Sequence, residues 1–470
     1  MTCAYNRESQ LADLDTPISI YLKLRDHFER VVLLESNDFR SADNSHSYIC
    51  CDALHSIRVS GDRLTVSGPE DTRQRIVPVR EMLEAIKEAA SQISCTGSKP
   101  DALPVTGYFG YFAYDAVRYF ETIDLSGKGP AQIPDIALDF FRYVIAFDHF
   151  RQSIHIIEHQ PAGQPSGIPL IRNLINRTDI LHTPFHLTGP LRSNMTDDEY
   201  MSHVRKGKEH CQQGDVFQVV LSRRFDQDFR GDNFNVYRAL RRINPSPYLF
   251  YFDYGQYQLF GSSPESQLVI HDGMARIHPI AGTYRRTGDE ATDQQAAAAL
   301  LKDEKELSEH TMLVDLARND LNRHADNVQV AAYREIHHYS HVMHIISEVC
   351  GHLRPGIHAL DAFAGCFPAG TLSGAPKYRA MEIIHEREPT RRSYYGGAIG
   401  FFDLDHNMNT AIMIRSFLSQ GNTLTMQAGA GIVVSSDPGR ENAEVKHKLQ
   451  ALVRALEEAA KTTIHEAAPA

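Results

Sequence analysis

Residues 367–377 (FPAGTLSGAPK) constrain the local chain more than any other stretch of the sequence. Glycines there let backbone N–H groups approach a ligand with no Cβ in the way. Residues 378–384 are expected to start a helix, and the end of a helix where it begins favours anions. The stretch therefore predicts an anion cradle for a carboxylate or phosphate, with Thr371, Ser373 and Lys377 nearby. An ordinary Pro/Gly loop between core elements is an equal alternative, because a glycine-rich loop alone is a weak signal.

Composition sets the class of protein. The chain has 470 residues, of which 42% are hydrophobic, so it is long enough for a large core and for more than one simple domain. Its net charge is -11 and it has no basic tract, so no nucleic acid partner is expected. The seven cysteines are an odd number without CxxC spacing, which is typical of a reducing compartment. With no signal peptide and no run of about 18 apolar residues, no membrane contact and a cytoplasmic location are expected.

The first half of the chain predicts mainly short strands between turns. A polar turn at 35–38 follows a buried run at 31–34, and it represents either plain turn chemistry or a pocket for a small ligand's amino group. Residues 159–168, rich in proline and glycine, are the expected linker or exposed loop. The expected strands are 17–24, 31–34, several within 47–80, 107–115, 144–148 and 153–157, and a helix is expected at 78–93.

The second half predicts a mixture of helices and strands. Thr196 and Glu199 form a capping box for a helix that ends at Gly214. Two prolines within 244–248 stop a second helix, expected at 235–242. The remaining expected elements are one long helix over 293–320 and strands at 216–224, 248–254, 257–261, 395–402, 410–415 and 424–432.

Two predicted helices each carry a pair of glutamates three residues apart. Glu306 and Glu309 share one helical face, and so do Glu441 and Glu444. A single such pair is more often a solvated face than a site. Two ExxE helices together could hold a hard divalent cation through oxygen ligands, and Mg²⁺ suits such a set.

Two further features indicate anion binding. Arg415 is the last residue of a predicted strand and could bind a carboxylate in bidentate fashion, although an ordinary surface ion pair is the simpler interpretation. Glycines 429 and 431 lie in the last predicted strand, where the backbone could approach a ligand.

Several longer motifs occur in an order that resembles one family, the chorismate-utilising enzymes, and within it the large components of anthranilate synthases. The match is dense from about 195 to 455 and thin before that, at 33–36 and 107–115. The resemblance implies an α+β fold, a two-part sandwich of large antiparallel sheets flanked by helices. Residues 1–190 would carry a regulatory strand and 191–470 the chorismate-binding catalytic region, with the two intertwined. The matching stretches are 279–283, 303–310, 312–320, 341–344, 367–377, 428–432 and the ExxE at 441–444.

The resemblance also implies the reaction, in which chorismate and ammonia give anthranilate and pyruvate with Mg²⁺ as cofactor. By resemblance Glu265 is the general acid for the leaving hydroxyl, and His344 serves the elimination of pyruvate. The hydroxyl of Thr371 is implied to have an orienting role. The implied metal ligands are Glu306, Glu309, Glu441 and Glu444. The implied substrate contacts are Gly282, Thr283, Tyr395, Arg415, Gly429, Ala430, Gly431 and Lys448.

Two positions discriminate within the family. Ala281 stands where aminodeoxychorismate synthases carry a nucleophilic lysine, and an alanine cannot form that covalent adduct. Gln218 stands where isochorismate and salicylate synthases carry a lysine that activates water. Both positions favour direct attack by ammonia at C2. The alternatives are the aminodeoxychorismate synthase component of folate biosynthesis, a water-adding enzyme, and a non-catalytic homologue that binds chorismate or tryptophan.

The resemblance implies a partner and a regulator as well. The chain has no GxCLGxQ glutaminase motif, so ammonia is expected from a separate glutamine amidotransferase subunit, in a complex expected to be a heterotetramer. The resemblance implies a site that binds tryptophan as feedback inhibitor. His46 and Leu249 depart from the family's usual residues at this site. Its implied residues are Leu34, Glu35, Ser36, Asn244, Pro247, Tyr248 and Leu249.

Overall fold

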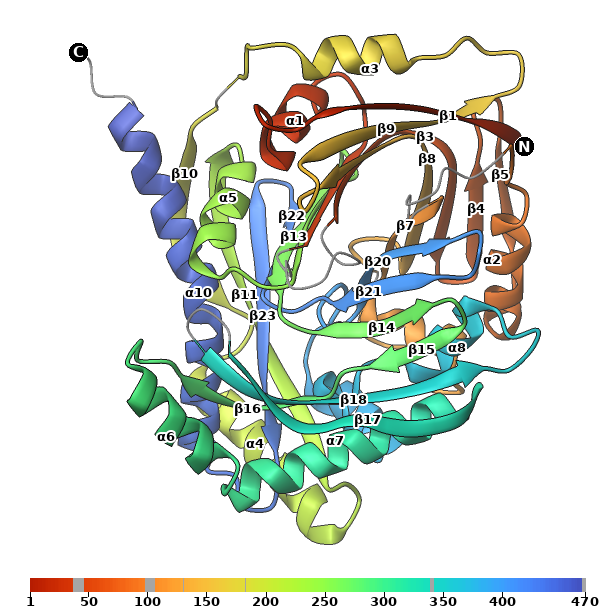
Figure 1. Cartoon of the computed structure of the whole chain (residues 1–470). Coiled ribbons are helices and arrows are strands. Elements are labelled where there is room, and N and C mark those ends of the chain that lie inside the picture. The colour runs from red at the N-terminus through yellow and green to blue at the C-terminus, as the bar shows by residue number, and fades with distance from the viewer. Residues whose placement is uncertain (37–45, 98–105, 130, 182, 339–341, 467–470) are drawn as a thin grey trace.

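The strands form two large antiparallel sheets that share the long pair β3 (His46–Ser60) and β8 (Ile136–Asp148) (Figure 1). The computed structural model describes residues 1–36, 46–97, 106–129, 131–181, 183–338 and 342–466. Along β8, the edge opposite β3 pairs first with β7 (Gly107–Phe112) and then with β9 (Ser153–Pro161). Because one strand changes partner along its length, the two sheets diverge from a common ribbon.

The first sheet extends from this ribbon in both directions. Beyond β9 it continues to β1 (Thr2–Leu11) and β6 (Ser94–Thr96), and the β1–β6 pair is parallel. Beyond β3 it continues as far as β23, which pairs with β11. Strand β11 also pairs with β10 and β19. The strands from β3 outward are β2 (Val31–Ser36), β12 (Tyr248–Asp253), β13 (Tyr257–Ser263), β22 (Ser416–Gln420), β23 (Thr423–Ile432), β11 (Gln218–Gly231), β10 (Phe185–Ser193) and β19 (Gly374–Ala375).

The second sheet continues from β7 and reaches β18, which β17 flanks on one side and β15 and β16 on the other. β2 pairs with β12 and β7 with β20, so residues 1–190 and 191–470 contribute to both sheets, and the boundary at 190 stays a prediction. The strands are β20 (Ala398–Asp403), β21 (Met408–Ile412), β14 (Ser266–His271), β15 (Met274–Ile277), β16 (Ile280–Arg285), β17 (Ala325–His338) and β18 (Val342–Leu353), with β4 (Arg63–Ser67) and β5 (Thr72–Ile76) beyond β3.

Helices cover the outer faces of both sheets (Figure 1). One apolar cluster joins α1, α3, α4, α5, α9 and α10 to the first sheet, and another joins α2, α7 and α8 to the second. The helices are α1 (Pro17–Leu24), α2 (Met82–Ala90), α3 (Ile168–Ile175), α4 (Asp197–Gln213), α5 (Phe234–Ile243), α6 (Glu290–Leu300), α7 (Glu304–Asn322), α8 (Ala359–Cys366), α9 (Lys377–Arg387) and α10 (Pro438–Glu466). The expected fold of large antiparallel sheets flanked by helices is therefore confirmed.

Two expected elements are wrong. Residues 17–24 form a helix rather than a strand, because Thr16 and Ser19 make a capping box and Pro17 occupies the first turn. The expected single helix over 293–320 is two helices, since α6 ends at Leu300 and α7 begins at Glu304. Asp303 lies in the break, and its side chain accepts the backbone N–H of Glu306 at 3.2 Å.

The helix expected to end at Gly214 is confirmed as α4. Thr196 and Glu199 form the predicted capping box, and Gly214 ends the helix with a left-handed φ of 80°. The linker expected at 159–168 is shorter than predicted, because β9 continues to Pro161 and α3 begins at Ile168.

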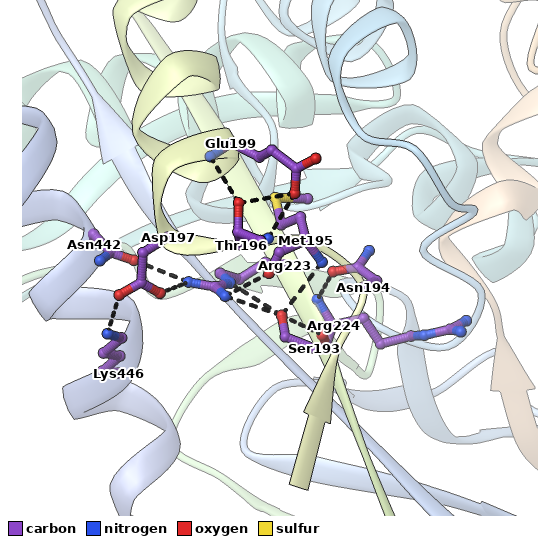
Figure 2. Close-up of polar contacts among 10 residues, drawn as sticks. All are labelled: Ser193, Asn194, Met195, Thr196, Asp197, Glu199, Arg223, Arg224, Asn442 and Lys446. Atoms are coloured by element: carbon purple, nitrogen blue, oxygen red, sulfur yellow. Dashed lines mark hydrogen bonds and ion pairs between the residues drawn. The ribbon is translucent and has the colours of Figure 1, made fainter.

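A buried arginine joins the start of α4 to α10 (Figure 2). Arg223 of β11 is only 3% exposed. Its guanidinium donates to Asp197 Oδ1 at 2.7 Å, to Asn442 Oδ1 at 3.0 Å and to the Met195 carbonyl at 2.6 Å. Lys446 of α10 contacts the same Asp197. The joint therefore fixes the first two turns of α10, which carry Glu441 and Glu444.

We expect Arg223→Met to lower the free energy of unfolding by about 3 kcal/mol, because it leaves buried acceptors without a donor. Urea denaturation measures the difference. The matched control is Arg224→Met, whose side chain is partly exposed and contacts Asp226 at 3.3 Å. We expect the control to cost less than about 1 kcal/mol. Equal losses in the two variants would contradict a structural role for the Arg223 joint.

Candidate active site

Strand β23 of the first sheet carries two of the predicted glycines, Gly429 and Gly431, and borders helix α10. Gly429 pairs with Ser222 of β11. Lys448 of α10 donates its Nζ proton to the Gly429 carbonyl at 2.9 Å and forms an ion pair with Glu444 at 2.8 Å. One predicted metal ligand and one predicted substrate contact therefore meet at this strand.

Helix α7 approaches the same strand through Gln218. The Nε2 of Gln218 donates to Glu309 Oε1 at 3.0 Å. The same Nε2 lies 2.5 Å from the position that a Cβ on Gly431 would take. Helix α10 thus reaches β23 at Gly429 through Lys448, and helix α7 approaches β23 at Gly431 through Gln218. Ala430, between them, directs its side chain into the core, so only its backbone is available to a ligand.

Glu265 has a pKa above the ordinary value of a glutamate side chain. Thr371 donates a hydrogen bond to Glu265 Oε1 at 2.9 Å. Burial raises the pKa of Glu265 to about 7, although the Thr371 hydrogen bond and the positive charges of Arg415 and Lys448 oppose the rise. Glu265 therefore carries a proton near neutral pH while two cations lie close to it, which is the state that a general acid requires.

His344 and Gly282 are also brought together. The Nδ1 of His344 lies 2.8 Å from the Gly282 carbonyl oxygen. Because a carbonyl only accepts, Nδ1 carries the proton of the neutral ring and Nε2 is the basic nitrogen. Burial lowers the pKa of His344, and the charge of Arg415 lowers it further.

Gly282 has a φ of +65°, which favours glycine. A Cβ there would lie 2.8 Å from Leu300 Cδ1 and 3.3 Å from Glu306 Oε2, so Glu306 lies beside this turn. The side chain of the neighbouring Thr283 lies outside the described part of the structure.

Among the other candidates, Tyr395 is buried and Arg415 is half-buried. Arg415 Nη1 donates to Asn244 Oδ1 at 3.3 Å, and the Arg415 carbonyl accepts the N–H of Ser262 at 3.1 Å. Burial lowers the pKa of Arg415, and the negative charge of Glu265 opposes this. Burial also raises the pKa of Tyr395, and a hydrogen bond with the backbone of Gly429 opposes that rise. The site is thus a buried group of opposed charges beside a strand of glycines.

The stretch 367–377 resembles the plain loop more than the anion cradle. Lys377 pairs with Asp320 at 2.7 Å. A Cβ on Gly370 would lie 2.2 Å from Leu316, and one on Gly374 would lie 2.1 Å from the Gln218 carbonyl oxygen. These glycines therefore allow close packing against α7 and β11.

The predicted metal ligands are carboxylates, whose oxygens suit a hard cation, and they come from two helices that approach the same strand. Glu441 is buried and Glu444 is partly exposed. Among the described residues, no three His, Cys, Asp or Glu side chains are grouped closely enough to hold a metal ion. In this structure Glu309 and Glu444 instead contact Gln218 and Lys448.

The residues predicted for tryptophan lie where β2 pairs with β12. Ser36 is opposite Tyr248, and Glu35 is opposite Leu249, whose side chain is fully buried. Leu34 is partly buried, and Pro247 precedes β12. His46 lies 3.6 Å from Asp148.

Glu35 has two protein partners. Tyr237 donates to its Oε1 at 2.6 Å, and Arg241 donates to its two oxygens at 2.9 and 3.0 Å. A ligand ammonium group would share Glu35 with these side chains. Asn244, from the same predicted set, contacts Arg415 instead and so links this set to the predicted substrate contacts.

The sequence analysis missed a buried ion pair behind the site. Arg392 donates to the two oxygens of Glu388 at 2.9 and 2.6 Å, and to the carbonyls of Leu372 and Val220 at 2.5 and 2.7 Å. Its guanidinium carbon lies 5.7 Å from the centre of the Tyr395 ring. A spacing of four between opposite charges was the available signal, but Glu388 follows the end of α9, where helical spacing no longer applies.

Known proteins match this arrangement over most of the chain. Residues 39–454 match the family of chorismate binding enzymes. The anthranilate synthase component 1 of Aquifex aeolicus is 38% identical over 466 residues, which are 95% of this chain and 93% of that protein.

Two solved structures share the fold. The anthranilate synthase component I of Streptococcus pneumoniae TIGR4 is 32% identical with a TM-score of 0.76, covering 87% of this chain and 92% of that one. The menaquinone-specific isochorismate synthase of Escherichia coli has a TM-score of 0.74 at 18% identity, covering 97% and 95%, and shows the fold alone. The predicted resemblance is confirmed: the chain belongs to the chorismate binding enzyme family.

Proposed function

We propose that the protein is the large component of an anthranilate synthase, a lyase of tryptophan biosynthesis that converts chorismate and ammonia to anthranilate and pyruvate. Relatives at 37 to 38% identity over most of the chain carry the name anthranilate synthase component 1. The observation that carries the proposal is Glu265, a carboxyl group with a pKa of about 7 that Thr371 orients beside Arg415 and Lys448.

Glu265 is the general acid of the first step. Ammonia adds at C2 of chorismate, the ring double bonds shift, and the C4 hydroxyl leaves. Hydroxide is a poor leaving group, so the carboxyl proton of Glu265 passes to it and water departs. Arg415 and Lys448 then stabilise the resulting carboxylate and bind the substrate carboxylates. The remaining contacts are Gly282, Thr283, Tyr395, Gly429, Ala430 and Gly431.

His344 serves the second step. The amino intermediate loses its C2 proton to a base and its C3–O bond breaks, which makes the ring aromatic. The departing enolpyruvate takes up one proton and becomes pyruvate. The lowered pKa keeps the imidazole neutral, and the Gly282 carbonyl holds the proton on Nδ1. Nε2 is therefore the atom that accepts the C2 proton.

Two uncharged residues favour anthranilate over other family products. Ala281 is buried in β16 and cannot form a covalent adduct with chorismate. Gln218 donates to Glu309 and cannot act as a base toward water. Ammonia is therefore the nucleophile that attacks the ring directly.

Mg²⁺ is the proposed cofactor, held by Glu306, Glu309, Glu441 and Glu444. When bound, it neutralises a substrate carboxylate and orients the ring. Gln218 and Lys448 contact two of these glutamates here, so a bound ion would share Glu309 and Glu444 with them.

A glutamine amidotransferase subunit is the proposed source of ammonia, in a heterotetramer. The relatives' name, component 1, supports a second component.

All seven cysteines are free thiols, which supports a reducing, cytoplasmic location. Among the described residues, no helix is both long and apolar enough to cross a membrane.

The function is tested on the purified chain alone, with chorismate, Mg²⁺ and a high concentration of ammonium salt at alkaline pH. We expect anthranilate fluorescence to rise and to stop when the metal is chelated. Chorismate consumed without fluorescence would favour aminodeoxychorismate or isochorismate as product. Chorismate that persists would favour a non-catalytic binding protein.

The pH dependence tests Glu265. With the concentration of free ammonia held constant, we expect kcat/KM for chorismate to fall about tenfold per pH unit above pH 7, because the general acid of the free enzyme loses its proton there. Glu265→Gln should lower kcat by about a hundredfold or more and remove this decline. The matched control is Glu457→Gln on the exposed face of α10. An unchanged pH profile in Glu265→Gln would contradict the role.

Tryptophan inhibition tests the β2–β12 residues. We expect tryptophan to lower the rate of the wild-type chain. Ser36→Ala should raise the inhibitory concentration about tenfold, because a hydrogen-bonding group is lost. Ser60→Ala, at the exposed end of β3, should leave inhibition unchanged. A rate that does not change at millimolar tryptophan would defeat the proposal of feedback inhibition.

A further inference from the structure

A small cavity lies directly behind the proposed general acid. Its volume is about 30 Å³, and it lies between β14, the loop at 369–371 and α7. The polar residues that line it are Glu265, Ser266, Gln267, Thr371 and Asp320, and most of the rest of the lining is apolar. A cavity needs about 10–15 Å³ measured this way to hold one water molecule, so this one accommodates a molecule of that size.

Gln267, which lines this cavity, has a buried acceptor without a partner among the described residues. Its side chain is only 3% exposed. Its Nε2 donates to the Cys366 carbonyl at 3.2 Å, which fixes the orientation of the amide. Its Oε1 is buried and accepts no hydrogen bond from any part of the chain that the structure describes. A buried carbonyl oxygen normally has a partner, so this atom points to a bound molecule.

Glu265 lines the same cavity. Glu265 and Gln267 are two residues apart at the start of β14, and both line the cavity. Thr371 already donates to Glu265 Oε1. The proton of the neutral carboxyl group is therefore expected on Oε2.

The cavity has an outer end at an ion pair. Asp320 lines the cavity and accepts a hydrogen bond from Lys377 at 2.7 Å. The two side chains are 14% and 13% exposed. A molecule in the cavity thus lies between Glu265 and a charged pair that touches solvent.

We propose that this cavity binds one small neutral hydrogen-bonding molecule, water or ammonia, which donates to Gln267 Oε1 and exchanges a proton with Glu265. The inference rests on the proposed function. In each turnover Glu265 transfers one proton to the leaving hydroxyl, which departs as water. One proton then returns from solvent to the carboxylate through the cavity molecule, which is regenerated unchanged. The site gives the half-buried Glu265 a route for reprotonation.

The test compares two variants of the full chain in the ammonia-dependent assay. Gln267→Met keeps the length of the side chain but removes the acceptor, and Ala317→Val narrows the cavity from α7. We expect each to lower the rate at a fixed, subsaturating ammonia concentration about tenfold while KM for chorismate changes less than about twofold. Gln427→Met is the matched control. Gln427 is also buried with an unpartnered Oε1 among the described residues, but it does not line the cavity.

The identity of the molecule follows from a second readout. If it is water, KM for ammonia stays constant and the solvent deuterium isotope effect on kcat rises in both variants. If it is ammonia, KM for ammonia rises about tenfold and saturating ammonia restores kcat. A crystal structure of the wild-type chain should show density within hydrogen-bonding distance of Gln267 Oε1.

The inference is overturned if both variants match the wild type, or if Gln427→Met loses as much activity as Gln267→Met. A cavity without density in the crystal would overturn it as well. These outcomes differ from failure of the proposed function, in which the wild-type chain itself makes no anthranilate. Melting temperatures within a few degrees of the wild type exclude loss of fold as the cause.

Discussion

The pairing of β11 with β23 is the constraint on which the rest of the site depends. Ten consecutive residue pairs join the two strands, from Val219 opposite Ile432 to Asp228 opposite Thr423. This register sets Gly429 and Gly431 on one face, within reach of Lys448 from α10 and of Gln218, which contacts Glu309 of α7. A slip by one residue would turn both glycines into the core. Because Arg223 of the same strand holds the start of α10, the register also positions Glu441 and Glu444.

The proposed acid depends on charges that oppose one another at short range. Burial alone favours a neutral Glu265, while Arg415 and Lys448 favour its carboxylate, and the balance lies near neutral pH. Arg415 also contacts Asn244, which belongs to the residues predicted for tryptophan. Asn244 is therefore linked to the acid through Arg415, by one hydrogen bond and one charge interaction.

Local signals predicted much of the fold, and contacts between distant residues set the limits. The capping box at Thr196 and the proline after Asp437 correctly located the starts of α4 and α10, because capping involves neighbours in sequence. Thr16, Pro17 and Ser19 carry the same kind of signal, but the apolar run that follows also fits a strand. The motifs identified the family and nominated Glu265, yet its raised pKa, the Arg392–Glu388 pair and the acceptor of Gln267 arise from residues brought together only by folding.

The central claim is that chorismate binds between β23 and Glu265. A crystal structure of Glu265→Gln with chorismate and Mg²⁺ tests it most directly, because the variant slows turnover. The account predicts the ring against Gly429 and Gly431, with carboxylates at Arg415 or Lys448 and the C4 hydroxyl facing residue 265. Chorismate bound elsewhere, or a C4 hydroxyl that faces away from residue 265, would contradict it.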